Sequence, residues 1–372
     1  MNDKVYVINF SNKIIMDKIM ANETTQQHLI GRLPRLLGSG VDYNDAIEVI
    51  TNMNEVADWS KGWEKVGERH QIRGDKAFEA GDLITAGEAY FRATISFHTG
   101  QSGNVEDPDE KLRVQTLQRK AYLKAMPYLN PKTERIVVPF ENIEFPGNLR
   151  LPVNYSNKPV PCVLLNAGAD STKEEFFTLE NEFLKRGLAT CAFDGPGQGM
   201  TWQKMKLRPD FESPVGAVLN ILENRPEIDS SRLGIWGRSM GGYAAPRVAA
   251  YDKRIKACIS LGGYFDMISF WDTSSEVLLD ILQFAFGATD RNNAREIAHG
   301  FTLKSSAEHI TCPLLIVHSD QDNICPYSEA EKMLATVGKN AELVMFKGGN
   351  HCCDNKPAEV RPMMADWMSK QL

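Results

Sequence analysis

From about residue 131 onward, short apolar runs alternate with stretches of helical periodicity, and this alternation restricts the possible folds most. Apolar runs of four or five residues stand at 162–165, 189–193, 233–236, 257–261, 314–317 and 343–346. The segments between them are long enough for crossover helices, for example over 176–186 and 215–222. Strands that alternate with helices form a mainly parallel sheet covered on both faces, and right-handed crossovers make it doubly wound. The sequence therefore predicts an α/β fold.

The part of the chain before residue 131 has a different pattern. Between about residues 22 and 128, apolar residues recur at helical spacing, as at Ala86, Tyr90, Ala93 and Phe97. No second copy of this pattern follows at a fixed period, so a helical repeat array is not expected. We predict a helical N-terminal domain over 1–130 and an α/β domain over 131–372. A helix-rich insert is expected within the second domain, at about 274–309.

Charge and hydropathy exclude several partners. The 372 residues include 42 Lys and Arg against 48 Asp and Glu, a formal net charge of −6. An acidic chain without a basic block is a poor match for nucleic acid or an anionic membrane surface, so neither partner is expected. The apolar runs are far shorter than the roughly 20 residues of a membrane span. Charged residues interrupt the first 20 positions, so no secretory signal is expected.

Cysteine usage points to the cytoplasm. The seven cysteines are an odd number, and no CxxC pair with zinc or redox spacing occurs. Most of them stand in apolar, strand-like contexts, which is typical of free cysteines that pack in the core like small hydrophobic residues. We therefore expect reduced thiols, a cytoplasmic protein and no metal site.

The strongest local motif is G-x-S-x-G, at residues 237–241. An apolar strand precedes it and an Ala-rich helix start follows it, which is the strand–turn–helix context of a nucleophile elbow. The turn projects the hydroxyl of Ser239 above the sheet and places the first amides of the next helix beside a developing oxyanion. Ser239 is therefore the predicted nucleophile. Haloalkane dehalogenase chemistry is not favoured, because it would require aspartate at this position.

A serine hydroxyl needs a base, and the base needs an orienting carboxylate. His351 follows the last predicted strand in a Gly-Gly-Asn-His loop, from which its ring can reach back over the sheet edge. Asp320 and Asp322 both follow the preceding strand, and the spacing to Ile324 and the next proline favours Asp322. The predicted triad is Ser239, Asp322 and His351, in the chain order of α/β-hydrolases.

Two backbone amides are predicted to form the oxyanion hole. One belongs to Met240, directly after the nucleophile, and the other to Ala169, in the loop after the strand at 162–165. The run DGPGQG at 194–199 lacks the spacing of a nucleotide-binding loop and is interpreted as a structural turn. No cofactor is expected.

The chain resembles the 2,6-dihydroxypseudooxynicotine hydrolase group of α/β-hydrolases. The resemblance lies in the runs ADSTKEEFF, FDGPGQG, GRSMGGYAA, CISLGGYFD and GGNHCC, and in RLPRLLGSGVDYNDA and AGEAYFRA of the helical part. It implies an α/β-hydrolase fold with an N-terminal helical cap domain, a homodimer, and cofactor-free hydrolysis of a C–C bond beside a ketone. The group's nucleophile, acid and base fall on Ser239, Asp322 and His351.

The sequence departs from this group in places. Ser319 replaces the glycine of the acid turn, and Ala167 stands where a second glycine is common. The group's auxiliary acid has no assigned counterpart here, although Asp266, Asp272 and Glu276 follow the strand at 257–261. The bond specificity is therefore left open.

Four residues are candidates for substrate contact. Tyr90 and His98 belong to a polar line in the helical part, and ordinary helix packing explains that line equally well. Tyr264 and Asp266 follow the strand at 257–261.

Several functions remain possible at this stage. The leading hypothesis is a serine hydrolase that cleaves a small ketone or acyl substrate, with a C–C bond beside the carbonyl as one target. An esterase, amidase or acyltransferase would use the same triad. A non-catalytic binding protein on a hydrolase fold is the alternative from another class, and such proteins typically lose a triad member.

Overall fold

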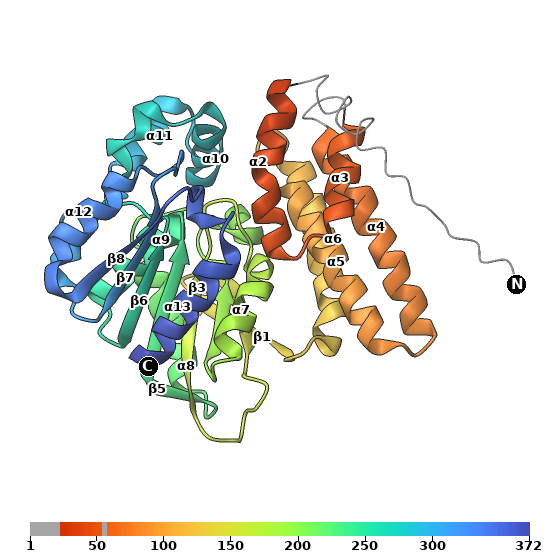
Figure 1. The fold of residues 1–372 in the computed structure, drawn as a ribbon, viewed down its shortest axis with the longest axis horizontal. Helices are drawn as coiled ribbons and strands as arrows, with labels where there is room; N and C mark the ends of the chain where they lie inside the picture. The colour runs from red at the N-terminus through yellow and green to blue at the C-terminus, as the bar shows by residue number, and fades with distance from the viewer. Residues whose placement is uncertain (1–22, 54–57) are drawn as a thin grey trace, which may run out of the picture.

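The computed structural model describes residues 23–53 and 58–372. The first 22 residues of the predicted N-terminal domain, where no secretory signal was expected, lie outside the described residues. The described part consists of a helical layer followed by an α/β part (Figure 1).

The α/β part contains one eight-stranded sheet with the order β1-β2-β4-β3-β5-β6-β7-β8. The pairs β1–β2 and β2–β4 are antiparallel, and the other neighbours are parallel. Every apolar run listed above lies in a strand, so the predicted α/β-hydrolase fold with a mainly parallel, doubly wound sheet is confirmed. The strands are β1 (Thr133–Phe140), β2 (Ile143–Arg150), β3 (Val160–Asn166), β4 (Ala189–Phe193), β5 (Ile228–Arg238), β6 (Ile255–Leu261), β7 (Leu314–Ser319) and β8 (Ala341–Phe346).

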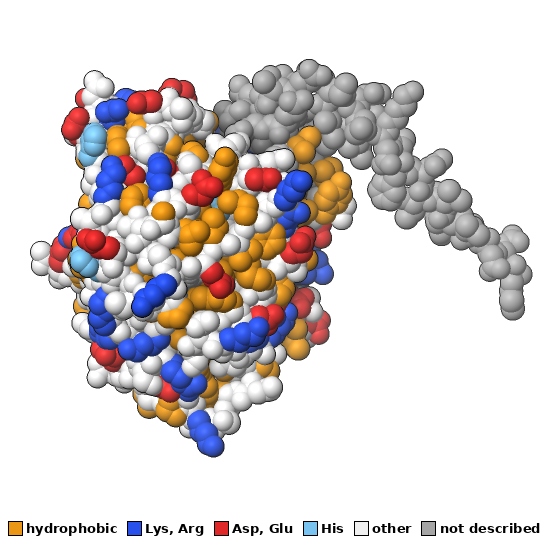
Figure 2. Space-filling view, turned by 60° about the vertical axis from the view of Figure 1, so that its left-hand side comes forward, with side chains coloured by type: hydrophobic (Ala, Val, Ile, Leu, Met, Phe, Trp, Pro, Cys, Tyr) orange, Lys and Arg blue, Asp and Glu red, His pale blue; other side chains and the backbone are white. Residues whose placement is uncertain are grey.

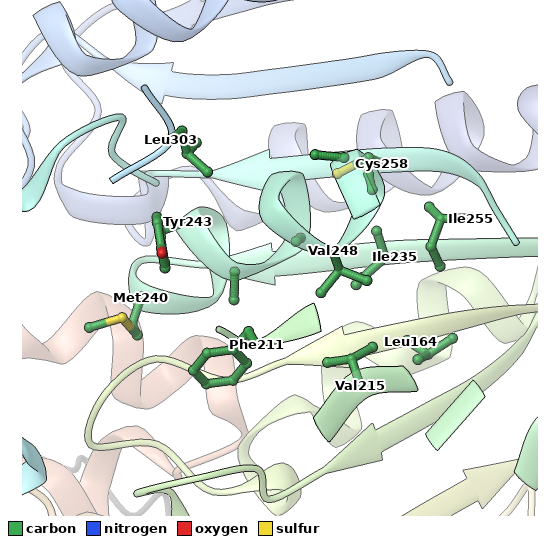
Figure 3. Packing of buried hydrophobic residues seen from close by; sticks show 14 of the residues in the cluster. Leu164, Phe211, Val215, Ile235, Met240, Tyr243, Val248, Ile255, Cys258 and Leu303 are labelled. Carbon is green, nitrogen blue, oxygen red and sulfur yellow. The ribbon is translucent and has the colours of Figure 1, made fainter. Parts of the chain in front are cut away.

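Helices cover both faces of this sheet. Residues of α8 (Glu212–Glu223), α9 (Met240–Tyr251) and α12 (Tyr327–Val337) belong to one apolar cluster with the strands, and residues of α7 (Phe177–Leu184) and α13 (Pro357–Gln371) belong to another. Figure 3 shows the first cluster, in which Val248 of α9 and Val215 of α8 lie over Ile235 of β5 and Leu164 of β3. Because both faces are buried, the central strands are apolar throughout, which explains the continuous apolar runs of the sequence.

The helical layer lies beside the sheet (Figure 1). Trp59 and Trp63, with rings 5.6 Å apart, are buried in its core, as hydrophobic spacing predicts for core residues. Its helices are α2 (Glu23–Ser39), α3 (Tyr43–Asn52), α4 (Asp58–Glu79), α5 (Leu83–Gln101) and α6 (Pro108–Ala125). The last helical turn ends at Tyr128, and β1 begins at Thr133.

The segment between β6 and β7 is rich in helix. It contains α10 (Glu276–Phe286), α11 (Arg291–Ala298) and three short 3-10 helices: Met267–Ser269, Trp271–Thr273 and Ala307–His309. This segment follows the carboxyl end of β6, and in Figure 1 α10 lies toward the helical layer. The insert therefore stands at the sheet edge where parallel strands present functional loops.

Charges of both signs are interspersed over the face seen in Figure 2, without one large patch of a single sign. Across residues 23–53 and 58–372, no helix combines the length and the apolar character needed to cross a bilayer.

Candidate active site

Ser239 occupies the sharp turn between β5 and α9. Its φ of 55° and ψ of −117° cost a non-glycine residue energy and persist mostly at functional sites. A Cβ atom on Gly237 would overlap the backbone of Gly241, and one on Gly241 would overlap the carbonyl of Asn166. The Ser239 amide donates to the Leu261 carbonyl at 2.9 Å. The turn therefore needs both glycines for close approach, and it is anchored to β6.

His351 and Asp322 contact each other at the neighbouring strand ends. The Nδ1 atom of His351 lies 2.8 Å from Oδ2 and 3.0 Å from Oδ1 of Asp322. The amides of Ile324 and Cys325 also donate to Asp322 Oδ1, at 2.9 and 2.8 Å. Because the carboxylate is fixed by backbone amides, it fixes in turn the tautomer and the orientation of the imidazole.

Asp322 is held as an anion. Burial of its side chain would raise its pKa, but the His351 ring and the donated hydrogen bonds outweigh this and lower the pKa below its usual value. Asp320, the other carboxylate that the sequence offered, is exposed and accepts a hydrogen bond from the Gly348 amide at 2.6 Å. Of these two aspartates, Asp322 is therefore the one in contact with His351.

The turn that carries His351 has an unusual backbone. Cys352 and Cys353 both adopt positive φ angles, 56° and 53°. Nε2 of His351 lies 3.3 Å from the Cys352 thiol, and that thiol lies 3.6 Å from the same Leu261 carbonyl that accepts the Ser239 amide. Among the described residues no hydrogen bond joins Ser239 to His351, whose Nε2 instead contacts Cys352. Hydrogen bonds between catalytic residues often form or shorten only when substrate binds.

The His351 ring also has a shifted pKa. Burial disfavours the charged imidazole, but the neighbouring Cys352 and the Asp322 carboxylate act in the opposite direction and raise the pKa above its usual value. The carboxylate therefore stabilises the imidazolium that forms when the ring takes a proton.

The two predicted oxyanion donors flank Ser239. Met240 is the first residue of α9, and its amide is one of those that a helix leaves without an internal partner. The loop with Ala169 reaches the elbow through Gly168, where an added Cβ atom would lie 3.8 Å from the Cβ of Ser239. Both segments are therefore adjacent to the serine.

Gln198 positions this loop, although its segment was predicted only as a structural turn. Its Nε2 donates to the carbonyls of Ala167 at 2.8 Å and Gly168 at 3.2 Å, and its Oε1 accepts from the Gly195 amide at 3.0 Å. In a trans peptide the carbonyl and the next amide point in opposite directions. The amide of Ala169 therefore points away from Gln198. The sequence shows a glutamine within the glycine-rich run, but a single polar residue does not reveal the distant groups that it contacts.

The helical layer holds the same loop from the other side. Asp170 accepts hydrogen bonds from Lys111 Nζ at 2.6 Å, from Ser102 Oγ at 3.1 Å and from the Gly103 amide. Burial would raise the pKa of Asp170, but Lys111 and these donors lower it below its usual value. The loop after β3 is thus fixed by both parts of the chain.

The two candidates from the helical layer both have polar partners within the protein. The Tyr90 hydroxyl donates to Asp75 at 2.8 Å within the packed helices, so it contacts another helix. His98 Nδ1 lies 3.2 Å from Thr172 Oγ1, and His98 Nε2 lies 3.5 Å from Glu175. His98 therefore supports the loop after β3, while Tyr90 takes part in helix packing.

The other two candidates differ in their surroundings. The Tyr264 hydroxyl donates to the Met240 sulfur at 3.0 Å, and its ring stacks on Tyr243 with centroids 5.1 Å apart. Asp266 is buried and forms an ion pair with Lys304 at 2.5 Å. Tyr264 therefore lies next to the elbow, whereas the carboxylate of Asp266 already has a cationic partner.

A cavity of about 290 Å³ lies between α6, the β1–β2 pair and the loops after β3 and β4. Its lining includes Gln118, Thr172, Lys173 and Asp194, and it includes none of the three predicted catalytic residues. The loop after β3 therefore borders both this cavity and the nucleophile.

Over the described ranges, no group of three or more His, Cys, Asp or Glu side chains is arranged to bind a metal ion. The seven cysteines are buried and carry free thiols.

Comparison with known proteins gives a consistent family assignment. A family model described as esterase FrsA-like matches residues 42–372. The 2,6-dihydropseudooxynicotine hydrolase of Paenarthrobacter nicotinovorans is 31% identical over 336 residues, which is 90% of each chain. The α/β-hydrolase pydG of an Acremonium species is 35% identical over 258 residues, covering 64% of this chain and 60% of the relative.

Solved structures agree. A crystal structure of 2,6-dihydroxy-pseudo-oxynicotine hydrolase matches with a TM-score of 0.85 and 30% identity, over 91% of this chain and 95% of the other. The AbyA5 structure matches with a TM-score of 0.68 at 18% identity, over 88% and 92% of the two chains, which shows the shared fold alone.

Proposed function

Because the chain belongs to the esterase FrsA-like family of hydrolases, we propose that it is a serine hydrolase with the triad Ser239, Asp322 and His351. The observation that carries this proposal is the pairing of His351 Nδ1 with the buried Asp322 carboxylate, beside a serine on a strained elbow. Such a pairing leaves Nε2 as the atom that takes and returns a proton.

The reaction has two stages. Ser239 Oγ attacks the substrate carbonyl and gives its proton to His351 Nε2, while the amides of Met240 and Ala169 stabilise the oxyanion. The C–X bond then breaks, and His351 returns the proton to the leaving group. Water, activated by His351, hydrolyses the acyl-enzyme and restores Ser239. For these reaction steps to occur, His351 Nε2 must exchange its contact with the Cys352 thiol for one with the Ser239 hydroxyl.

The substrate is proposed to be a small ketone or acyl compound. From the resemblance to the 2,6-dihydroxypseudooxynicotine hydrolase group, one target is a C–C bond beside the carbonyl. Its leaving group is a carbanion that must be stabilised as an enol or at an electron-rich ring carbon. Of the carboxylates following β6, Asp266 pairs with Lys304, Asp272 with Arg295 and Glu276 with Arg291.

Ester hydrolysis is the second candidate. An alkoxide leaves without an auxiliary acid, and the ion pairs just described engage each acid that the sequence offered for that role. The description of the family as esterases favours the same reaction.

A fluorophosphonate probe tests the triad. We expect it to label Ser239 in the folded protein and to leave Ser239→Ala unlabelled, and His351→Gln is expected to react at least 100-fold more slowly. A folded wild-type protein without labelling would support the non-catalytic binding protein instead. Profiling with p-nitrophenyl esters and aryl ketones, with products identified by mass spectrometry, separates the ester and C–C reactions.

A homodimer and a cytoplasmic location are also part of the proposal. The buried, free thiols are consistent with a reducing compartment. Analytical ultracentrifugation tests the first, and fractionation of the host cell tests the second.

A further inference from the structure

Four charged side chains, of which Glu175 and Arg238 are buried, form a continuous chain of ion pairs beside the candidate active site. Arg35 donates two hydrogen bonds to Glu175, at 2.7 and 2.9 Å. Arg238 Nη1 lies 3.4 Å from the same Glu175 carboxylate, and its Nη2 donates to Asp354 at 2.9 Å. Glu175 is only 3% exposed and Arg238 only 7%. Charges so deeply buried are costly unless each one is paired, and here each has a partner.

Two members of this chain of ion pairs, Arg238 and Asp354, lie next to predicted catalytic residues. Arg238 is the last residue of β5 and directly precedes Ser239. Asp354 directly follows the 3-10 turn His351–Cys353. The bond between Arg238 and Asp354 therefore joins the nucleophile strand to the turn that carries the base.

That turn needs external support. Cys352 and Cys353 have positive φ angles, a conformation that side chains other than glycine hold only when their surroundings enforce it. Asn350 and Asn355 close the turn by reciprocal amide-to-side-chain hydrogen bonds of 3.0 Å each. Arg238, at the end of β5, donates to Asp354 and so connects the C-terminal end of this turn to the sheet.

The chain of ion pairs continues into the helical layer. Arg35 belongs to α2, and His98 of α5 lies 3.5 Å from Glu175. Arg35 also donates to Ser171 Oγ at 3.1 Å, in the loop that carries the predicted oxyanion donor. One carboxylate, Glu175, therefore links two helices of the layer with the elbow.

On the basis of the proposed function, we infer that Glu175, Arg238 and Asp354 are positioning residues, which align the base-bearing turn with Ser239 and make this alignment depend on docking of α2. None of them touches the reacting atoms. Arg238 is the central member, because it contacts both carboxylates.

The structure offers a matched control for this inference. Arg150 and Glu180 form another buried ion pair, 3.3 Å apart, with exposures of 0% and 2% for their side chains. Glu180 also accepts a hydrogen bond from Thr190. This pair joins α7 to β2 and β4 and makes no contact with the elbow or the base-bearing turn. Loss of the Arg150–Glu180 pair or of the contacts of Glu175 and Arg238 should lower stability. Only loss of the contacts of Glu175 and Arg238 should also change catalysis.

The experiment compares Glu175→Gln and Asp354→Asn with Glu180→Gln. The second-order rate of labelling by a fluorophosphonate is measured at a temperature where thermal unfolding shows each variant to be folded. We expect about a 10-fold slower rate for Glu175→Gln and Asp354→Asn, and the wild-type rate for Glu180→Gln. Glu175→Asp, which restores the charge, is expected to recover part of the rate.

The outcomes separate this inference from the function on which it rests. If folded wild-type protein is not labelled, the proposed function fails. If the wild type is labelled and both Glu175→Gln and Asp354→Asn react at its rate, the positioning role is refuted while the triad stands. If Glu180→Gln slows labelling as much as Glu175→Gln does, the effect is one of general stability, and the inference is again refuted. Asp354, at the half-buried end of the chain, gives a variant that should fold even if Glu175→Gln does not.

Discussion

Replacement of Gln198 by methionine tests how the oxyanion loop is built. Methionine has nearly the same length and shape as glutamine but neither donates nor accepts a strong hydrogen bond. The change removes the bonds from Nε2 to the carbonyls of Ala167 and Gly168, and the bond from the Gly195 amide to Oε1. The peptide between Gly168 and Ala169 then loses the contact that directs its amide.

The magnitude follows from these contacts. Three hydrogen bonds at about 1 kcal/mol each give a loss of about 3 kcal/mol in the free energy of unfolding. For a chain of 372 residues, with an unfolding entropy of about 2.1 cal/mol/K per residue, this lowers Tm by about 4 °C. If Ala169 is an oxyanion donor, the labelling or hydrolysis rate falls further, toward the roughly 100-fold loss expected when one such donor is removed.

The assay pairs thermal unfolding with the rate of fluorophosphonate labelling at 25 °C, where the variant remains folded. Gln203→Met is the control, because Gln203 lies in the adjacent 3-10 helix Gly199–Gln203 with an exposed side chain. We expect wild-type behaviour from it. A Gln198→Met variant that loses about 4 °C in Tm but is labelled at the wild-type rate would refute the reasoning, since the loop would then work without its fixed peptide orientation.

Other contacts of the candidate site lead to three more predictions. Gly241→Ala should misfold or lose labelling entirely, because its Cβ would overlap the Asn166 carbonyl, and circular dichroism with labelling checks this. Asp322→Asn should fold but lose about four orders of magnitude in labelling rate, since the imidazole tautomer is no longer fixed. The lowered pKa of Asp170 contributes stability that is fully present above the unfolded value of about 3.9 and is lost as pH falls through the folded value. Urea unfolding between pH 7 and 3 should therefore show a flatter acid limb for Asp170→Asn than for the wild type.

The periodicity of the sequence predicted the strands well but not their arrangement. Each apolar run became a strand because strands buried on both faces must be apolar along their whole length. The same property makes the runs alike. They therefore do not reveal that β3 lies between β4 and β5 in the sheet. The order depends on crossovers and on helix packing, which are properties of the assembled layers.

Local motifs predicted those site residues whose function is fixed by a short turn. The glycines around Ser239 are required by backbone contact, and so they form a recognisable pattern. Gln198, Glu175 and Arg238 were missed because each acts on a partner distant in the chain, and a single polar residue carries no periodic signal. His98 belongs to a polar line that helix packing explained equally well, and it contacts Thr172 and Glu175. A role for His98 in substrate contact stays a prediction.

The contacts across residue 130 explain why a helical layer accompanies this hydrolase sheet. The loop after β3 places Asp170, Thr172 and Glu175 within six residues, and each finds partners in the helical layer: Asp170 in Lys111, Thr172 in Gln118, and Glu175 in Arg35. Buried carboxylates without those partners would be strongly destabilising. The loop that approaches Ser239 is therefore completed by the helices, so that the layer acts as a structural part of the candidate site, and any motion that opens it also disturbs the loop beside the nucleophile.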